Sequence, residues 1–129
     1  MKFKDKTEDG HPQRTEDRET ITLAAFTDRV YHKAPNICHL NGMHDGKVLR
    51  LEKSSGFADF VVWNPWIAGA AKIADLDDEE WSSFICVEAV QSSKVIHVKA
   101  SNEKENYWKA SHVLSLRDAI EDVSFRSKL

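Results

Sequence analysis

A chain of 129 residues predicts a single domain over residues 1–129, long enough to bury a core. Its 18 basic and 21 acidic side chains leave a net charge of −3, which argues against a nucleic-acid partner, since such partners require a basic surface. No apolar run approaches the ~20 residues of a membrane span, and the charged start lacks the apolar core of a secretory signal. We therefore expect a cytoplasmic protein without membrane contact.

The first part of the chain is mostly charged. Residues 1–19 contain one aromatic residue near the start, Phe3, so we predict a short strand there followed by a long exposed turn. The run Thr20–Phe26 alternates apolar and polar residues at its start, which predicts a half-buried strand that leads directly into residues 27–31.

The clearest local signal is a β-hairpin. Ile37–Leu40 and Lys47–Glu52 have the composition of short strands. Between them stand Asn41-Gly42 and Asp45-Gly46, dipeptides that supply the positive φ angles of tight turns. The sequence therefore predicts two antiparallel strands joined at residues 41–46.

Residues 57–90 contain the most apolar segments. Phe60–Trp63 predicts a strand that ends before Pro65, because proline cannot donate to a strand ladder. Pro65 is in turn well placed to begin a short helix. The segment Asp77–Trp81 indicates one helical turn with its acids at the N-terminal end, and Phe84–Ala89 predicts a second strand.

The C-terminal part predicts two more strands, at Val95–Lys99 and within the alternating segment from Trp108 to Leu116, with a turn at Ser101-Asn102. Residues 117–129 have no clear period and are expected to form a flexible tail. Several short strands separated by turn signals predict an all-β fold, an antiparallel β-sandwich with one or two short helices.

Glu88 is an acidic residue in the otherwise apolar segment 84–89. Burying an unpaired carboxylate is costly or raises its pKa, so Glu88 is either a strand residue whose carboxylate reaches solvent or a functional group. Period-two alternation places Glu88 on the same face of the strand as Phe84 and Cys86. The other face would then carry Ile85, Val87 and Ala89.

Other candidate residues carry weaker signals. Two histidines lie five positions apart across the hairpin turn, but no third ligand has a matching spacing, so we predict no metal site. Cys38 and Cys86 are too few for a disulfide framework and are expected to be free thiols, with Cys86 in the core. Trp63 and Trp66 are either core residues or a platform on which a sugar ring stacks.

Five segments occur in a fixed order along the chain: Phe3-Lys4-Asp5-Lys6-Thr7, Thr27-Asp28-Arg29-Val30-Tyr31, Val61-Val62-Trp63-Asn64-Pro65-Trp66, Ala74-Asp75 and Cys86-Val87-Glu88-Ala89. Together they resemble the motifs of the glucose-6-phosphate 1-epimerases, or D-hexose-6-phosphate mutarotases, which are relatives of aldose 1-epimerase. The resemblance implies a galactose mutarotase-like β-sandwich that binds sugar on a concave sheet, of which this chain is similar to the C-terminal half.

The resemblance also implies roles for two acids. Glu88 would be the catalytic base that takes the proton from the anomeric hydroxyl, and Asp28 would bind a sugar hydroxyl. The partner would be a hexose 6-phosphate, and the reaction would need no metal or organic cofactor. The family's acid histidine and phosphate-binding arginines lie upstream of the motif that contains Asp5, and neither His11 nor His32 matches a histidine motif of the family.

We therefore interpret the chain as a fragment, a shortened gene product or a diverged remnant of an epimerase. Because a positioned acid contributes ~10²–10⁴-fold, residues 1–129 alone are expected to show little or no epimerisation. The alternative is a non-catalytic carbohydrate-binding or interaction module, and the simplest interpretation is a β-domain whose aromatic residues are all core. Uncovered strand edges would favour self-association.

Overall fold

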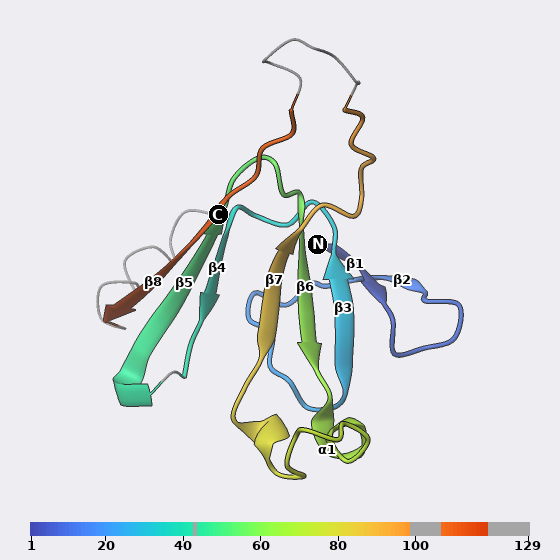
Figure 1. Ribbon diagram of the computed structural model, residues 1–129, viewed down its shortest axis with the longest axis vertical. Helices are drawn as coiled ribbons and strands as arrows, with labels where there is room; N and C mark the ends of the chain where they lie inside the picture. Colours follow the sequence, from blue (N-terminus) through green and yellow to red (C-terminus); the bar gives the residue numbers. More distant parts are fainter. Residues whose placement is uncertain (43, 99–106, 119–129) are drawn as a thin grey trace. The chain divides into compact units, whose positions relative to one another are not determined.

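The computed structural model describes residues 1–42, 44–98 and 107–118, and it divides into two compact units. The first unit comprises residues 1–34 and 58–95, and the second comprises residues 35–57 and the described residues from 96 onward. Each unit is built on one antiparallel sheet, as Figure 1 shows. The predicted all-β, antiparallel fold class is confirmed.

The sheet of the first unit has five strands in the order β2-β1-β3-β6-β7, with antiparallel pairing throughout. Its strands are β1 (Lys2–Asp5), β2 (Gln13–Thr15), β3 (Thr27–Tyr31), β6 (Asp59–Asn64) and β7 (Cys86–Val90). The helix α1 (Trp66–Ala70) and the 3₁₀ turn η2 (Glu80–Ser82) lie in the connection from β6 to β7 (Figure 1).

The two faces of this sheet differ in burial. We call the buried one the inner face; its buried residues are Phe3, Asp5, Thr27, Tyr31, Phe60, Val62 and Asn64. The segment that follows β2 lies against it, since the Tyr31 hydroxyl donates to Glu16 Oε2 at 3.5 Å. The opposite face, which we call the outer face, carries Lys2, Lys4, Asp28, Val30, His32, Val61, Trp63, Cys86 and Glu88. Most of these side chains are half-buried or exposed.

The sheet of the second unit has the order β4-β5-β8, formed by β4 (Ile37–Leu40), β5 (Lys47–Lys53) and β8 (His112–Asp118). The predicted hairpin is confirmed, because β4 and β5 pair antiparallel from Ile37↔Glu52 to Leu40↔Leu49. The connection contains the 3₁₀ turn η1 (His44–Gly46), and Gly42 and Gly46 have φ angles of 82° and 67°. Both glycines thus adopt the left-handed conformation that the turn dipeptides predict.

Three predictions for strands and turns were wrong. Thr20–Phe26 forms no strand, although Ile21 and Leu23 are half-buried. The strand begins at Thr27, because its partners end there: Thr27 pairs with Asn64, the last residue of β6. The expected exposed turn after Phe3 instead contains β2, which pairs with β1.

The third error concerns Val95–Lys99. Residues 95–98 form no strand, and Val95 is 75% exposed. Local β propensity alone is not sufficient, because these residues have no strand to pair with in the described part of the chain. Lys99 and the predicted turn at Ser101-Asn102 lie outside the described residues. The flexible tail was predicted to begin at residue 117, but Arg117 and Asp118 belong to β8, so the prediction was wrong for these two residues. The rest of the predicted tail also lies outside the described residues.

The predictions around Pro65 hold with small shifts. Helix α1 begins directly after Pro65, and the acidic turn is observed as η2. The predicted strand Phe84–Ala89 is observed as Cys86–Val90. Within it Cys86 and Glu88 lie on the outer face and Val87 and Ala89 on the inner face, as the alternation predicts.

Candidate functional site

Asp28 and Glu88 lie on the outer face of the same sheet. The central strand β6 relates them, because Trp63 is paired with Asp28 on one side and with Cys86 on the other, and Val61 is paired with Glu88. The two acids therefore stand on the strands that flank β6, offset by two residues. With about 4.8 Å between strands and about 3.4 Å per residue, their Cα atoms are about 12 Å apart. The two predicted site residues thus face a common space.

Asp28 is held by an ion pair. Lys6 Nζ donates to Oδ1 and Oδ2 of Asp28, both at 3.1 Å. The Asp28 side chain is 19% exposed and that of Lys6 is 41% exposed, so water screens the pair and its net contribution to stability is small. Asp28 therefore stays accessible from the outer face while its charge is balanced.

A turn at the end of β1 positions Lys6. Asp5 Oδ1 accepts hydrogen bonds from the Thr7 N–H at 3.1 Å and the Thr7 hydroxyl at 2.6 Å, and Arg29 Nε donates to Asp5 Oδ2 at 3.3 Å. Burial of Asp5 opposes ionisation, but these donors outweigh it, and the pKa of Asp5 is lowered. The Asp5-Lys6-Thr7 segment thus folds back locally and directs Lys6 to Asp28.

Glu88 is exposed. The sequence left open whether Glu88 is a strand residue whose carboxylate reaches solvent or a functional group, and the structure shows that the side chain does reach solvent. Its neighbour on the same face is Cys86, whose pKa is raised first by burial and then by the Glu88 charge. Cys86 is half-buried, so the prediction that it lies in the core was wrong. An exposed carboxylate on the outer face can meet a ligand without displacing other side chains.

The two tryptophans have different surroundings. Trp63 is half-buried on the outer face, and its ring centroid lies 6.0 Å from that of Phe84. Trp66 belongs to α1 and packs on Trp81, with a centroid distance of 4.3 Å. A sugar platform on the outer face would therefore be made by Trp63 and Phe84, and Trp66 would not contribute to it.

Asn64 is a buried residue for which the sequence predicted no role beyond ending a strand. Its Nδ2 donates to the carbonyl oxygens of Trp81 and Phe84, both at 2.8 Å, and its Oδ1 accepts from the Trp66 N–H at 2.9 Å. One side chain thereby ties the end of β6 to the start of α1 and to the approach to β7. This holds Phe84 beside Trp63.

Asp59 is a second residue that the sequence did not single out. Its side chain is 0% exposed, and its carboxylate accepts hydrogen bonds from the Lys33 N–H and from the N–H and hydroxyl groups of Ser92 and Ser93. Burial alone would raise the pKa of Asp59, but these donors lower it to about 2. Asp59 therefore joins the end of β3, the start of β6 and the loop after β7.

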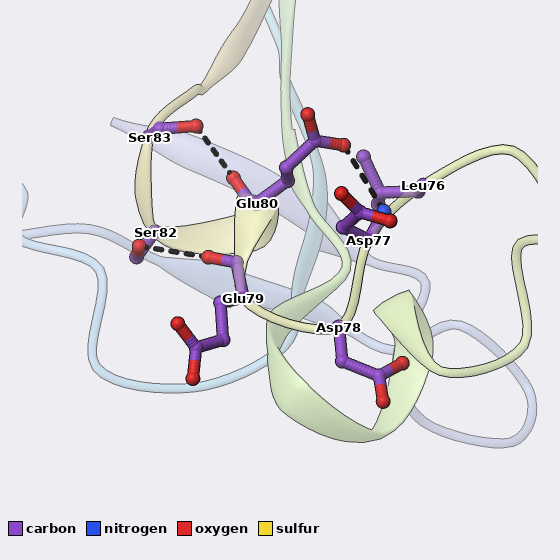
Figure 2. Close-up of a pocket in the computed structure, with 7 residues that line it drawn as sticks. All are labelled: Leu76, Asp77, Asp78, Glu79, Glu80, Ser82 and Ser83. Carbon is purple, nitrogen blue, oxygen red and sulfur yellow. Dashed lines mark hydrogen bonds between the residues drawn. The ribbon is translucent and has the colours of Figure 1, made fainter.

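An acidic depression lies in the loop before β7 and is lined by Leu76, Asp77, Asp78, Glu79, Glu80, Ser82 and Ser83 (Figure 2). Glu80 Oε2 accepts a hydrogen bond from the Asp77 N–H at 3.0 Å. In Figure 2 the carboxylate groups of Asp78 and Glu79 point away from that of Glu80. The depression would repel a sugar phosphate, and the described residues include no group of three ligands that could hold a metal ion.

Cys38 and Cys86 are free thiols, as predicted, and burial raises the pKa of Cys38. Among residues 1–42, 44–98 and 107–118, no helix has the length and apolar character needed to cross a membrane.

Comparisons with known proteins agree with the motif resemblance. Over 101 residues the chain is 32% identical to a protein of Cenchrus ciliaris named "Putative glucose-6-phosphate 1-epimerase". The match covers 78% of this chain and 29% of that protein, so the chain spans less than a third of the relative's length. No protein-family model and no solved structure matches the chain. Most of this sequence is therefore similar to part of a protein with an epimerase name.

Proposed function

We propose that the outer face of the five-stranded sheet binds a hexose 6-phosphate and takes part in interconverting its α and β anomers. Glu88 is the base in this proposal, and Asp28 binds a sugar hydroxyl. The substrate class comes from the printed name of the similar protein and from the motif resemblance.

The observation that carries the proposal is the strand register. The pairing of β6 with β3 and β7 places two acids 60 residues apart in the sequence on one accessible face. Between them lies Trp63, whose indole suits the apolar C–H face of a pyranose. This combination of a carboxylate on each side and an aromatic ring between them is suited to a polyhydroxylated ring.

Ring opening requires the sugar to lose one proton and to gain another. Glu88 accepts the proton of the anomeric hydroxyl, an acid protonates the ring oxygen, and the bond between C1 and the ring oxygen breaks to give the open-chain aldehyde. Rotation about the bond to C1 and the reverse proton transfers close the other anomer. We assign no residue of this chain to the acid, so catalysis by the chain alone is expected to be slow.

Two-dimensional exchange NMR of glucose 6-phosphate tests the proposal. We expect exchange between the α and β signals, at high protein concentration, to be faster than in matched buffer. Exchange at the buffer rate, with no binding of the sugar phosphate, would contradict the proposal.

A second candidate is a carbohydrate-binding module without catalysis. The exposed Glu88 and the Lys6–Asp28 ion pair favour it, because both are compatible with hydroxyl recognition alone. Binding of the sugar phosphate with exchange at the buffer rate would support this candidate over the epimerase.

Substituting Asp28→Asn is expected to weaken sugar binding by about tenfold. A carboxylate makes a charge-assisted hydrogen bond to a hydroxyl, and the amide makes a weaker one. Binding is measured by calorimetric titration with glucose 6-phosphate, and Asp75→Asn, which changes an exposed acid of the same unit, is the matched control. Equal affinity of the Asp28 and Asp75 variants would remove Asp28 from the binding site.

A further inference from the structure

A pocket in the first unit has an unusual lining for a protein with a net charge of −3. Its walls are Lys2, Gln13, His32, Lys33 and Ser93, so it gathers two lysines and a histidine and no acidic residue. The lining offers N–H donors from three directions: β1, β2 and the end of β3. This composition suits an anion with several oxygens.

The two lysines of this pocket have no acidic partner among the described residues. Other cations of the described chain do form ion pairs, namely Lys6, Arg14, Arg18, Arg29, Lys47 and Arg50. His32 Nδ1 is buried, has no hydrogen-bond partner in the described structure and lies 3.8 Å from Asp59 Oδ1. The pocket therefore combines positive charge with unused hydrogen-bonding capacity.

The walls are held in place without a ligand. Asp59, buried beneath them, accepts from the Lys33 N–H at 3.0 Å, the Ser93 N–H at 2.6 Å and the Ser93 hydroxyl at 2.7 Å. Lys33 has a φ angle of 50°, a left-handed conformation that this anchoring maintains. Because five donors already surround the Asp59 carboxylate, its charge is compensated from within the protein.

The pocket opens on the face that carries Glu88. The His32 N–H donates to the Lys2 carbonyl at 2.9 Å, so these two residues face each other across β1 and the end of β3. His32 is two residues after Val30 and therefore lies on the same, outer face. Val30 is paired with Val61, and Val61 is paired with Glu88, so these three residues are neighbours across the sheet. His32 and Glu88 are therefore two strand spacings and two residues apart, or about 12 Å between Cα atoms.

We infer that this pocket, lined by Lys2, His32 and Lys33, is the subsite for the phosphate monoester group of the sugar ligand. The inference rests on the proposed function. In a hexose 6-phosphate the phosphate and the anomeric hydroxyl stand at opposite ends of the molecule, and His32 of the pocket and Glu88 lie about 12 Å apart on the outer face. Phosphate bound by the lysines directs the anomeric end toward Glu88.

The test is a ³¹P NMR titration of the 129-residue protein with inorganic phosphate and with glucose 6-phosphate. The double variant Lys2→Gln, Lys33→Gln is expected to bind both ligands about tenfold more weakly, because two charge-assisted contacts are lost. The control is Lys72→Gln, Lys109→Gln, which removes the same charge at two exposed lysines outside the pocket and is expected to bind within about twofold of the unsubstituted protein. Circular dichroism establishes that all variants fold.

Unchanged binding in the pocket variant, or equal weakening in the control, would overturn the inference. Its failure can be told from failure of the proposed function. Weaker phosphate binding in the pocket variant, without anomer exchange by the unsubstituted protein, supports the phosphate subsite and contradicts the epimerase. Anomer exchange that persists with unchanged binding in the pocket variant supports the epimerase and removes this subsite.

Discussion

Replacing Glu88 by glutamine is expected to abolish the protein-catalysed part of anomer exchange, a loss of about 100-fold or more. The amide has nearly the same shape but does not accept a proton at neutral pH, and a positioned base typically contributes about 10²–10⁴-fold. Because Glu88 is exposed, the substitution leaves the fold unchanged. The rate is measured by exchange NMR on glucose 6-phosphate in imidazole buffer, so that imidazolium supplies a proton for the ring oxygen.

The matched control is Glu79→Gln, which neutralises another exposed acid of the same unit and should retain the catalysed rate. Phosphate affinity should be the same in both variants, because neither residue lines the basic pocket. A Glu88→Gln protein with the exchange rate of the unsubstituted chain would exclude Glu88 as the base.

The second large effect is expected for stability. Asp59→Asn should lower the free energy of unfolding by about 2–5 kcal/mol, because the amide nitrogen faces groups that are themselves donors and leaves some of them unsatisfied. Asp59 Oδ2 alone accepts from the Ser92 N–H, the Ser92 hydroxyl and the Ser93 N–H. Urea denaturation measures the loss. Asp75→Asn is the exposed control and should change the value by less than about 0.5 kcal/mol.

The same carboxylate makes stability depend on pH. The pKa of Asp59 is about 2 in the folded protein, against 3.8 for the ordinary group. A depressed folded pKa contributes stability that is fully present above about pH 4 and is lost as the pH falls toward 2. The contribution is about 2 kcal/mol. The Asp59→Asn protein should therefore lose less stability between pH 5 and pH 2, and an equally steep loss would contradict the assignment. The pKa of Glu16 is also lowered to about 2, so both proteins are expected to keep some loss of stability over the same pH range.

The local elements were predictable wherever the sequence carried its own turn or pairing signal. The hairpin of β4 and β5 has two glycines at the required positions, and β6 is bounded by Pro65. Thr20–Phe26 and Val95–Lys99 have strand composition but no such signal for a partner. Strand formation depends on a neighbouring strand, and a partner distant in the sequence cannot be read from composition.

Two acids with the same sequence signature have opposite environments. Asp59 and Glu88 each interrupt an apolar run, and the cost of burial raised the question of function for Glu88. The structure buries Asp59, because it lies at the start of β6 where Lys33, Ser92 and Ser93 reach it. Glu88 lies on β7, the last strand in the sheet order, and is exposed. Position in the sheet, which depends on long-range pairing, separates the two cases.

The shared face of Asp28 and Glu88 was likewise beyond prediction, since it depends on two registers at once. This dependence limits how the coding sequence can change in length. Inserting or deleting one residue within β6 would rotate every later side chain of that strand to the opposite face, so that Trp63 would turn inward and Asp28 and Glu88 would lose their common alignment. Residues 71–79, the loop between α1 and η2, are not paired with any described strand. Insertions or deletions can therefore occur in this loop without altering the pairing of β6 with β3 or with β7.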